Sequence, residues 1–289
     1  MIRKINLSDF IILIFLVLSG IIIIYGKEKT EHFSMLIAAR IAAFAIVFIL
    51  IILDTIHNSK TISFLRHFYP LLFTSYFYGE TGYYNNIFFA DLDELFVQLE
   101  QSIFGFQPSL LFSLKYNSFW LNELMFFSYF SYYLIVIVSP LIIYLKKRDE
   151  FERLFFIIVF SFYSYYLFFV FIPVVGPQFY FVGEHAQITH SGLFGKMVKF
   201  FQNVGETPTG AFPSSHVGLS WIILLISAKT YKKLLIAIFP LALLICFSTV
   251  YIKAHYLIDI IAGVISAPVL YFLGGKIYSY YISKKARIS

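Results

Sequence analysis

Long apolar runs alternate with short polar segments along most of this chain of 289 residues. A helix needs about 20 apolar residues to cross a bilayer core, and most of the runs approach or exceed that length. The segment 62–79 is more polar, but we count it as a span. The predicted spans are 10–26, 34–54, 62–79, 118–145, 151–172, 214–229, 234–252 and 256–281. The pattern predicts an all-α, polytopic integral-membrane bundle with about eight spans.

Composition agrees with this class and excludes several others. Hydrophobic residues make up 60% of the chain and charged residues 13%, against about 45–50% and about 25% in soluble domains. This balance excludes an ordinary cytosolic enzyme and a disordered tail. A disulfide scaffold is excluded because Cys246 is the single cysteine. The net charge of +6 does not indicate nucleic-acid binding, since the basic residues lie in short clusters between apolar runs.

The basic residues predict the topology. With eight spans, one side of the membrane carries fourteen Lys and Arg residues and the other carries six. Both termini are therefore predicted to be cytoplasmic, because cytoplasmic loops carry the excess of positive charge. The fourteen are Arg3, Lys4, Lys60, Arg66, Lys146, Lys147, Arg148, Arg153, Lys229, Lys232, Lys233, Lys284, Lys285 and Arg287, and the six are Lys27, Lys29, Lys115, Lys196, Lys199 and Lys253.

Two long polar loops, 80–117 and 173–213, are predicted on the extracytoplasmic side. In the first loop apolar residues alternate with acidic residues such as Asp93 and Glu100, a spacing typical of an amphipathic helix at the membrane surface. Arg40 in the second span is expected to snorkel or to pair within the bundle.

Asp259 is the one acidic residue from Thr207 onward, and it follows His255 by four positions. A charged group at membrane depth costs about 2.5–3.5 kcal/mol, so it calls for a partner and a function. Residues i and i+4 share a helix face, so the carboxylate can accept a hydrogen bond from the near ring nitrogen and leave the far nitrogen's lone pair exposed. Such an imidazole suits a nucleophile or a base. The alternatives are a purely structural pair and a metal site, for which the adjacent sequence offers no further ligand.

The segment G-A-F-P-S-S-H-V-G, residues 210–218, is typical of a helix start. A serine is expected to cap the helix and Pro213 to lie in its first turn. The free N–H groups of a helix N-terminus bind anions, and His216 would hold a proton donor beside a bound phosphate. The alternative is a capped helix with a surface histidine. In the predicted topology both His216 and His255 reach the extracytoplasmic face.

Together, P-S-S-H-V-G and the later S-T-V-Y-I-K-A-H-Y-L-I-D-I-I-A-G (248–263) resemble two signature motifs of the type 2 phosphatidic acid phosphatase superfamily. Those motifs are usually written P-S-G-H and S-R-x-x-x-x-x-H-x-x-x-D. The resemblance implies a six-helix core in which His255 attacks phosphorus, Asp259 orients it and His216 protonates the leaving group. It also implies that no metal or cofactor is needed.

Three further runs resemble, more loosely, the branch that contains inositol phosphorylceramide synthases. They are LRHFYPLLFTSYFYGE, DELFVQLEQSIFGFQPSL and PVVGPQFYF.

The chain also departs from the family pattern. Thr249 occupies the usual position of a phosphate-binding arginine, Ser215 replaces the glycine, and the first family motif, K-x-x-x-x-x-x-R-P, is absent. Lost guanidinium groups weaken bidentate phosphate binding unless another cation substitutes. Lys253 is either that cation or an exposed interfacial lysine. The residues predicted to bind the substrate phosphate are Ser214, Ser215, Lys253, Ser248 and Gln178. His185 and His190, in the second polar loop, are either contacts to the lipid headgroup or ordinary loop residues.

These features predict a membrane phosphatase that hydrolyses a lipid phosphate through a phosphohistidine at the extracytoplasmic face. The alternatives are a phosphotransferase that uses a lipid or polyol hydroxyl as acceptor, and a proton-coupled transporter in which His255 and Asp259 relay protons. The expected partners are a lipid phosphate and the bilayer. The whole chain is predicted to be one membrane domain, divided into N-terminal spans (1–80), an interfacial segment (81–117) and a catalytic core (118–289).

Overall fold

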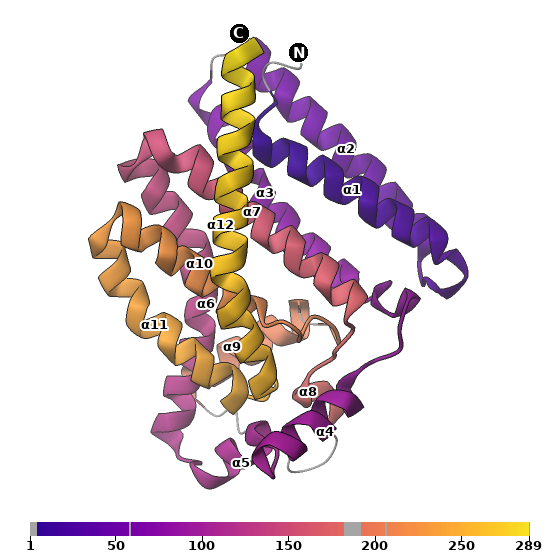
Figure 1. Ribbon diagram of the computed structural model, residues 1–289, viewed down its shortest axis with the longest axis vertical. Helices are drawn as coiled ribbons and strands as arrows, with labels where there is room; N and C mark the ends of the chain where they lie inside the picture. The colour runs from indigo at the N-terminus through magenta and orange to yellow at the C-terminus, as the bar shows by residue number, and fades with distance from the viewer. Residues whose placement is uncertain (1–4, 58, 182–191, 206, 289) are drawn as a thin grey trace.

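The computed structural model describes residues 5–57, 59–181, 192–205 and 207–288, which form helices joined by turns and loops. Two 3-10 helices, η2 (Lys27–Lys29) and η3 (Asn85–Ile87), accompany the α-helices (Figure 1). The α-helices are α1 (Leu7–Tyr25), α2 (Phe33–Ile56), α3 (Lys60–Thr81), α4 (Asp93–Phe104), α5 (Pro108–Lys115), α6 (Phe119–Lys146), α7 (Arg148–Phe171), α8 (Pro177–Tyr180), α9 (Leu193–Gly205), α10 (Ser215–Thr230), α11 (Lys232–Tyr251) and α12 (Leu257–Ile288). The predicted all-α polytopic bundle is confirmed.

Six helices among the described residues are long and apolar enough to cross a membrane: α1, α2, α6, α7, α11 and α12. The other two predicted spans, 62–79 and 214–229, are helical as well and correspond to α3 and α10. Helix α3 is less apolar because it contains Arg66, His67 and Glu80. Helix α10 has only 16 residues, which is fewer than a full crossing requires.

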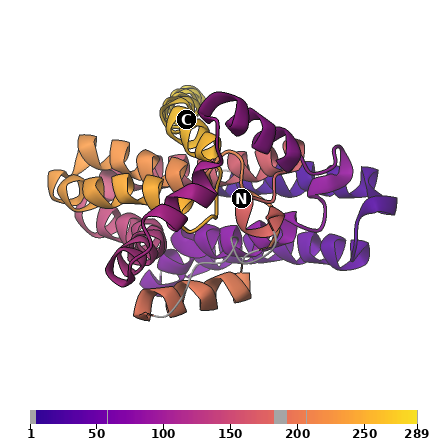
Figure 2. The same cartoon turned by 90° about the horizontal axis from the view of Figure 1, so that it is seen from below.

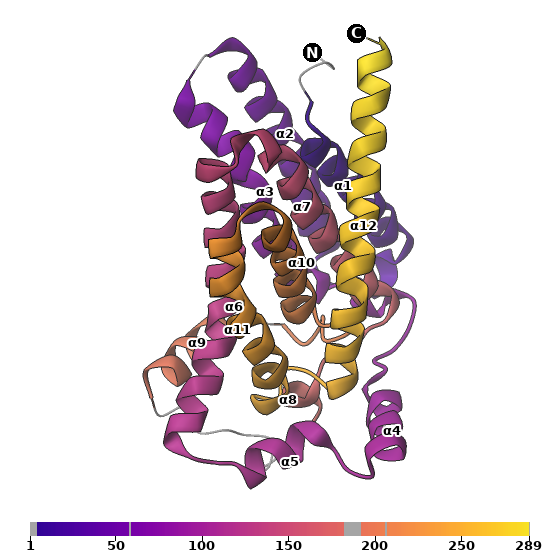
Figure 3. The same ribbon diagram turned by 60° about the vertical axis from the view of Figure 1, so that its left-hand side comes forward.

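Helix α10 runs inside the bundle. Figure 3 shows it beside α6, α11 and α12, and it also packs against α7. Two glycines permit this close packing. A Cβ atom at Gly218 would lie 1.8 Å from the hydroxyl of Tyr165, and one at Gly263 would lie 2.8 Å from the carbonyl oxygen of Ser214. Because longer helices surround it, α10 can be shorter than the bilayer is thick.

Helices α1, α2 and α3 lie on one side of the molecule, and α10 and α11 lie on the other (Figure 2). Buried ion pairs join the first three helices to one another. Nη1 of Arg40 is 3.0 Å from Oε1 of Glu80, and Arg66 pairs with both Asp9 and Asp54. Of the two expectations for Arg40, pairing within the bundle is the one observed.

Helix α1 begins and α12 ends at one end of the bundle, whereas α4, α5 and the start of α12 lie at the other end (Figure 1). This arrangement agrees with an even number of crossings. The predicted loop histidines His185 and His190, and the N-terminal Arg3 and Lys4, lie outside the described residues.

Candidate active site

The two motif histidines face each other. His255 lies in the turn between α11 and α12, and His216 lies in the first turn of α10. Nε2 of His255 is 3.3 Å from Nδ1 of His216. The helical hairpin of α10 and α11 returns the chain to the same end of the bundle, which is how residues 39 positions apart come into contact.

The other ring nitrogen of His255 contacts a backbone carbonyl. Nδ1 is 2.8 Å from the carbonyl oxygen of Ala211 and 3.4 Å from Oδ2 of Asp259. A carbonyl oxygen can only accept, so Nδ1 carries the proton and Nε2 presents its lone pair toward His216. The sequence predicted that the Asp259 carboxylate accepts this hydrogen bond. The structure shows that Ala211 makes the shorter contact, because the loop before α10 packs against the His255 ring.

Asp259 also organises the start of α12. Its side chain is fully buried, and Oδ2 accepts a hydrogen bond of 2.8 Å from the backbone N–H of Tyr256. Its backbone carbonyl accepts a hydrogen bond of 3.1 Å from the N–H of Ser214. The aspartate therefore links the His255 turn to the beginning of α10.

The start of α10 differs from the prediction in one respect. Ser214 is the N-cap, and its hydroxyl accepts a hydrogen bond from the N–H of Val217 at 3.4 Å, as expected for a capping serine. Ser215 is buried and is the first helical residue. Pro213 precedes the cap and does not lie in the first turn, because residues 211–214 form a turn and the helix begins only at Ser215.

Gln178 and Lys253 lie next to each other near the histidines. The N–H of Gln178 donates a hydrogen bond of 2.8 Å to the carbonyl oxygen of Lys253, and the Gln178 side chain accepts one from Gln202. Lys253 has a positive φ of 67° and is 1% exposed, so its interpretation as an exposed interfacial lysine is wrong. Burial lowers the pKa of its ammonium group, because it disfavours the charged form.

The hydroxyls of Ser248 and Thr249 are not directed at the histidines, although the carbonyl oxygen of Thr249 accepts a hydrogen bond of 3.1 Å from the backbone N–H of His255. Both side chains are fully buried, and their hydroxyls donate to the carbonyl oxygen of Ile245 in the same helix, at 3.2 Å and 2.9 Å. These hydrogen bonds satisfy both hydroxyls within α11. The position of the family arginine therefore holds a short polar side chain directed at its own helix.

Three tyrosines of α6 surround His216, a contact that was not predicted from the sequence. The ring of Tyr129 stacks on His216 with centroids 4.8 Å apart. The ring of Tyr132 is 4.3 Å away, and that of Tyr133 is 6.4 Å away. The available signal was the spacing of these tyrosines, since residues i, i+3 and i+4 share one face of a helix.

A cavity of about 10 Å³ lies beside the two histidines, which is room for about one water molecule. It is lined by Tyr78, Tyr129, Val175, Gln178, Phe179, Thr209, Gly210, Ala211, His216, Ala254 and His255. A phosphoryl group can enter between the histidines only if their rings move apart.

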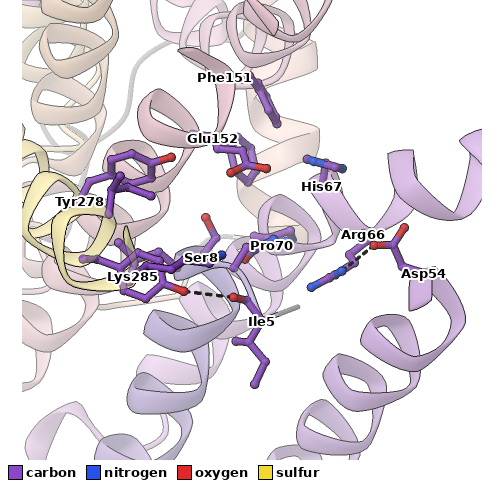
Figure 4. Close-up of a pocket in the computed structure, with 15 residues that line it drawn as sticks. Ile5, Ser8, Asp54, Arg66, His67, Pro70, Phe151, Glu152, Tyr278 and Lys285 are labelled. Carbon is purple, nitrogen blue, oxygen red and sulfur yellow. Dashed lines mark hydrogen bonds and ion pairs between the residues drawn. The ribbon is translucent and has the colours of Figure 1, made fainter. Parts of the chain in front are cut away.

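A larger cavity, of about 180 Å³, lies at the end of the bundle where the chain termini are, and Arg66, His67 and Lys285 contribute to its lining (Figure 4). It contains neither motif histidine.

Comparison with known proteins identifies the family. The family described as the PAP2 superfamily matches residues 94–273, well over half of the chain. The chain therefore belongs to the PAP2 superfamily, whose members are phosphatases or phosphotransferases. Together with the six apolar helices, this membership identifies an integral membrane protein. No curated protein and no solved structure matches the chain significantly.

Proposed function

We propose that this protein cleaves a phosphate ester on a membrane lipid, with His255 as the nucleophile. The observation that carries the proposal is the arrangement of its imidazole ring. Nδ1 is held as a donor by the Ala211 carbonyl, so the lone pair of Nε2 is directed toward His216. An imidazole held in one tautomer, with a second imidazole in contact, can supply both a nucleophile and a general acid.

In the first step, Nε2 of His255 attacks phosphorus and the bond from phosphorus to the lipid oxygen breaks. His216 gives its proton to the departing oxygen, so the lipid leaves as an alcohol. Asp259 and the Ala211 carbonyl stabilise the positive charge that develops on His255. In the second step, the neutral His216 takes a proton from water, which attacks the phosphohistidine and releases phosphate.

We place this chemistry at the extracytoplasmic leaflet, with both termini in the cytoplasm. The support is the excess of basic residues predicted on the side of the termini and the start of α12, which directly follows the His255 turn, at the opposite end of the bundle. The apolar helices around the site would hold the lipid tail while the headgroup reaches the histidines.

Restricted access of bulk water favours a second candidate, transfer of the phospho-group to an alcohol. His255 is 3% exposed, so bulk water has little access to its ring. A lipid or polyol hydroxyl would then replace water in the second step, as the looser resemblance to inositol phosphorylceramide synthases suggests. Labelled lipid phosphate, incubated with and without candidate alcohols, separates the two by yielding free phosphate or a new phosphodiester.

The test of the proposed function is phosphate release from a panel of lipid phosphates by the purified protein. His255→Ala should lower the rate by at least about a thousandfold, because it removes the nucleophile. Asp259→Asn should lower it by about 10²–10⁴-fold, because the charge that supports the imidazolium is lost.

The matched control is His57→Ala, which removes an exposed histidine at the end of α2. It should retain the wild-type rate. Full activity in His255→Ala, with His57→Ala also active, would falsify the mechanism.

A further inference from the structure

Helix α4 buries two of its three carboxylates, Asp93 and Glu100, and exposes several large apolar side chains. Asp93 and Glu100 lie seven residues apart on one face of the helix, and both are nearly fully buried. The opposite face exposes Leu95, Leu99 and Ile103. These exposed leucine and isoleucine side chains suit a helix whose outer face contacts lipid, while Phe96 is buried and Glu94 is exposed on the rest of its surface. The two buried carboxylates are directed at the rest of the protein.

Asp93 binds two backbone N–H groups of one loop. Its Oδ2 accepts a hydrogen bond of 2.8 Å from Val175, and its Oδ1 accepts one of 2.9 Å from Gly176. Hydrogen bonds to a charged acceptor are about twice as strong as those between neutral groups. The loop before α8 is therefore fastened to α4 by its backbone.

That loop and the following α8 form one wall of the histidine cavity. Val175 and Gln178 line the cavity, and the N–H of Gln178 bonds to the backbone of Lys253. Gly176 has a φ of +91°, and a Cβ atom there would lie 2.7 Å from the carbonyl oxygen of Ala254. The loop thus packs directly against the backbone that precedes His255.

Asp93 also binds the residue that follows the nucleophile. Its Oδ1 accepts a hydrogen bond of 3.0 Å from the hydroxyl of Tyr256, whose N–H binds the carboxylate of Asp259. Glu100 adds a further contact between α4 and α12, because its Oε1 accepts a hydrogen bond of 3.2 Å from the N–H of Ile258 at the start of α12. Both buried carboxylates of α4 therefore reach the turn that carries His255.

We propose that Asp93 is a positioning residue. Through it, α4 acts as a clamp that holds the cavity loop (173–180) and the nucleophile turn (252–258) in fixed positions relative to each other. This inference rests on the proposed function of His255. Asp93 does not contact the reacting atoms and acts through Tyr256 and through the backbone of Val175 and Gly176. Positional precision of this kind matters, because a misplacement of about 1 Å can lower a rate by about a hundredfold.

The first measurement is the kinetics of Asp93→Asn with a short-chain phosphatidate, or with the lipid phosphate that the wild type hydrolyses fastest. The amide nitrogen of asparagine cannot accept a hydrogen bond, so one of the two oxygen acceptors is lost. We expect kcat to fall by about 10- to 100-fold while KM stays within about twofold. Asp91→Asn is the matched control, because Asp91 is exposed and bonds only Asn86 among the described residues. It should retain the wild-type kcat.

A double-mutant cycle tests the link through Tyr256. Tyr256→Phe removes a single hydroxyl and keeps the aromatic packing, so it also serves if Asp93→Asn fails to fold. If Asp93 acts through this hydroxyl, the double variant should be no slower than Asp93→Asn alone. Fully multiplicative losses in kcat would overturn the link, and an unchanged kcat per folded molecule in Asp93→Asn would overturn the positioning role.

Hydrogen exchange tests the clamp independently of the proposed reaction. Asp93→Asn should exchange faster than Asp91→Asn in both the cavity loop and the nucleophile turn, whichever substrate the protein uses. Faster exchange in both segments, with no lipid phosphate hydrolysed by the wild type, would support the clamp and contradict the proposed function. Unchanged exchange, with an active wild type, would contradict the clamp alone.

Discussion

The two ring nitrogens of His255 have different partners, and this difference defines their chemistry. Nδ1 donates to the carbonyl oxygen of Ala211 with Asp259 close by, whereas Nε2 faces His216. A backbone carbonyl keeps its position and cannot ionise. It therefore holds the tautomer at any pH at which the imidazole is neutral. Asp259 adds the negative charge that a carbonyl lacks.

The titration of Glu100, in α4, makes the stability of the folded protein depend on pH. Burial, the largest influence, raises its pKa to about 7, and the charge of Asp259 acts in the same direction. Hydrogen bonds from the N–H groups of Ile258 and Leu257 oppose the rise. A carboxyl with a raised pKa stabilises the folded state most at low pH, and that contribution is lost as the pH rises from about 4.5 to above 7.

The Glu100→Gln variant should therefore melt at about the wild-type temperature at pH 5 and above it at pH 8. At pH 8 the wild type holds a buried carboxylate, whereas glutamine stays neutral. Thermal melts in detergent at both pH values provide the measurement. Glu94→Gln, at an exposed position of the same helix, should follow the wild-type trend between these pH values. Parallel pH curves for wild type and Glu100→Gln would contradict this account of Glu100.

At the scale of elements, the crossing of α10 and α12 fixes the spacing of the histidines. Gly263 lies at this crossing, and its missing side chain lets α12 approach the carbonyl oxygen of Ser214. Ser214 in turn caps the helix that carries His216. Separation of the two helices would displace His216 relative to His255.

Gly263→Ala should separate these helices, since its Cβ atom would meet Ser214 oxygen at 2.8 Å. We expect the free energy of unfolding to fall by about 1–3 kcal/mol and the rate of phosphate release to fall about tenfold or more. The control Gly275→Ala adds the same atom to the same helix, but its nearest neighbour is 3.8 Å away. Alanine favours helices, so this control should be neutral or slightly stabilising. Equal effects of the two substitutions on rate and stability would contradict the role assigned to the crossing.

The long helices were predictable from the sequence because their apolar runs approach or exceed the length of a membrane crossing. Helix α10 is the instructive exception. Its apolar run predicts a span, but only the packing at Gly218 and Gly263 shows that longer helices enclose it. The interfacial helix in 80–117 was expected. Its inward-facing Asp93 and Glu100 were not, since alternation of apolar and acidic residues does not tell which face is buried.

At the scale of the whole molecule, buried ion pairs join the N-terminal helices. Arg40 and Glu80 pair with side chains 4% and 2% exposed, and Arg66 pairs with Asp9 at the other end of the same helices. Removing one member of a buried pair leaves an uncompensated charge, whereas the intact pair is tolerated. These contacts connect α1, α2 and α3, which precede the segment matched by the PAP2 superfamily.

The candidate site was predictable only in part. His255, His216 and Asp259 follow from motif spacing, and the structure brings them together. The Ala211 carbonyl and the α6 tyrosines come from segments whose approach depends on tertiary packing. Ser248 was predicted to bind phosphate, but its hydroxyl bonds its own helix. A motif names residue types in order, and it does not show which of them face the cavity.

The most direct test of the central claim is to trap the covalent intermediate. Purified protein incubated with a lipid carrying radioactive phosphate, quenched in alkali and digested, should yield a phosphorylated peptide that contains His255. The label should be stable in alkali and released by acid, as expected for a phosphohistidine, and it should be absent from His255→Ala. Turnover of the lipid phosphate without a labelled His255, or with the label on another residue, would contradict the account.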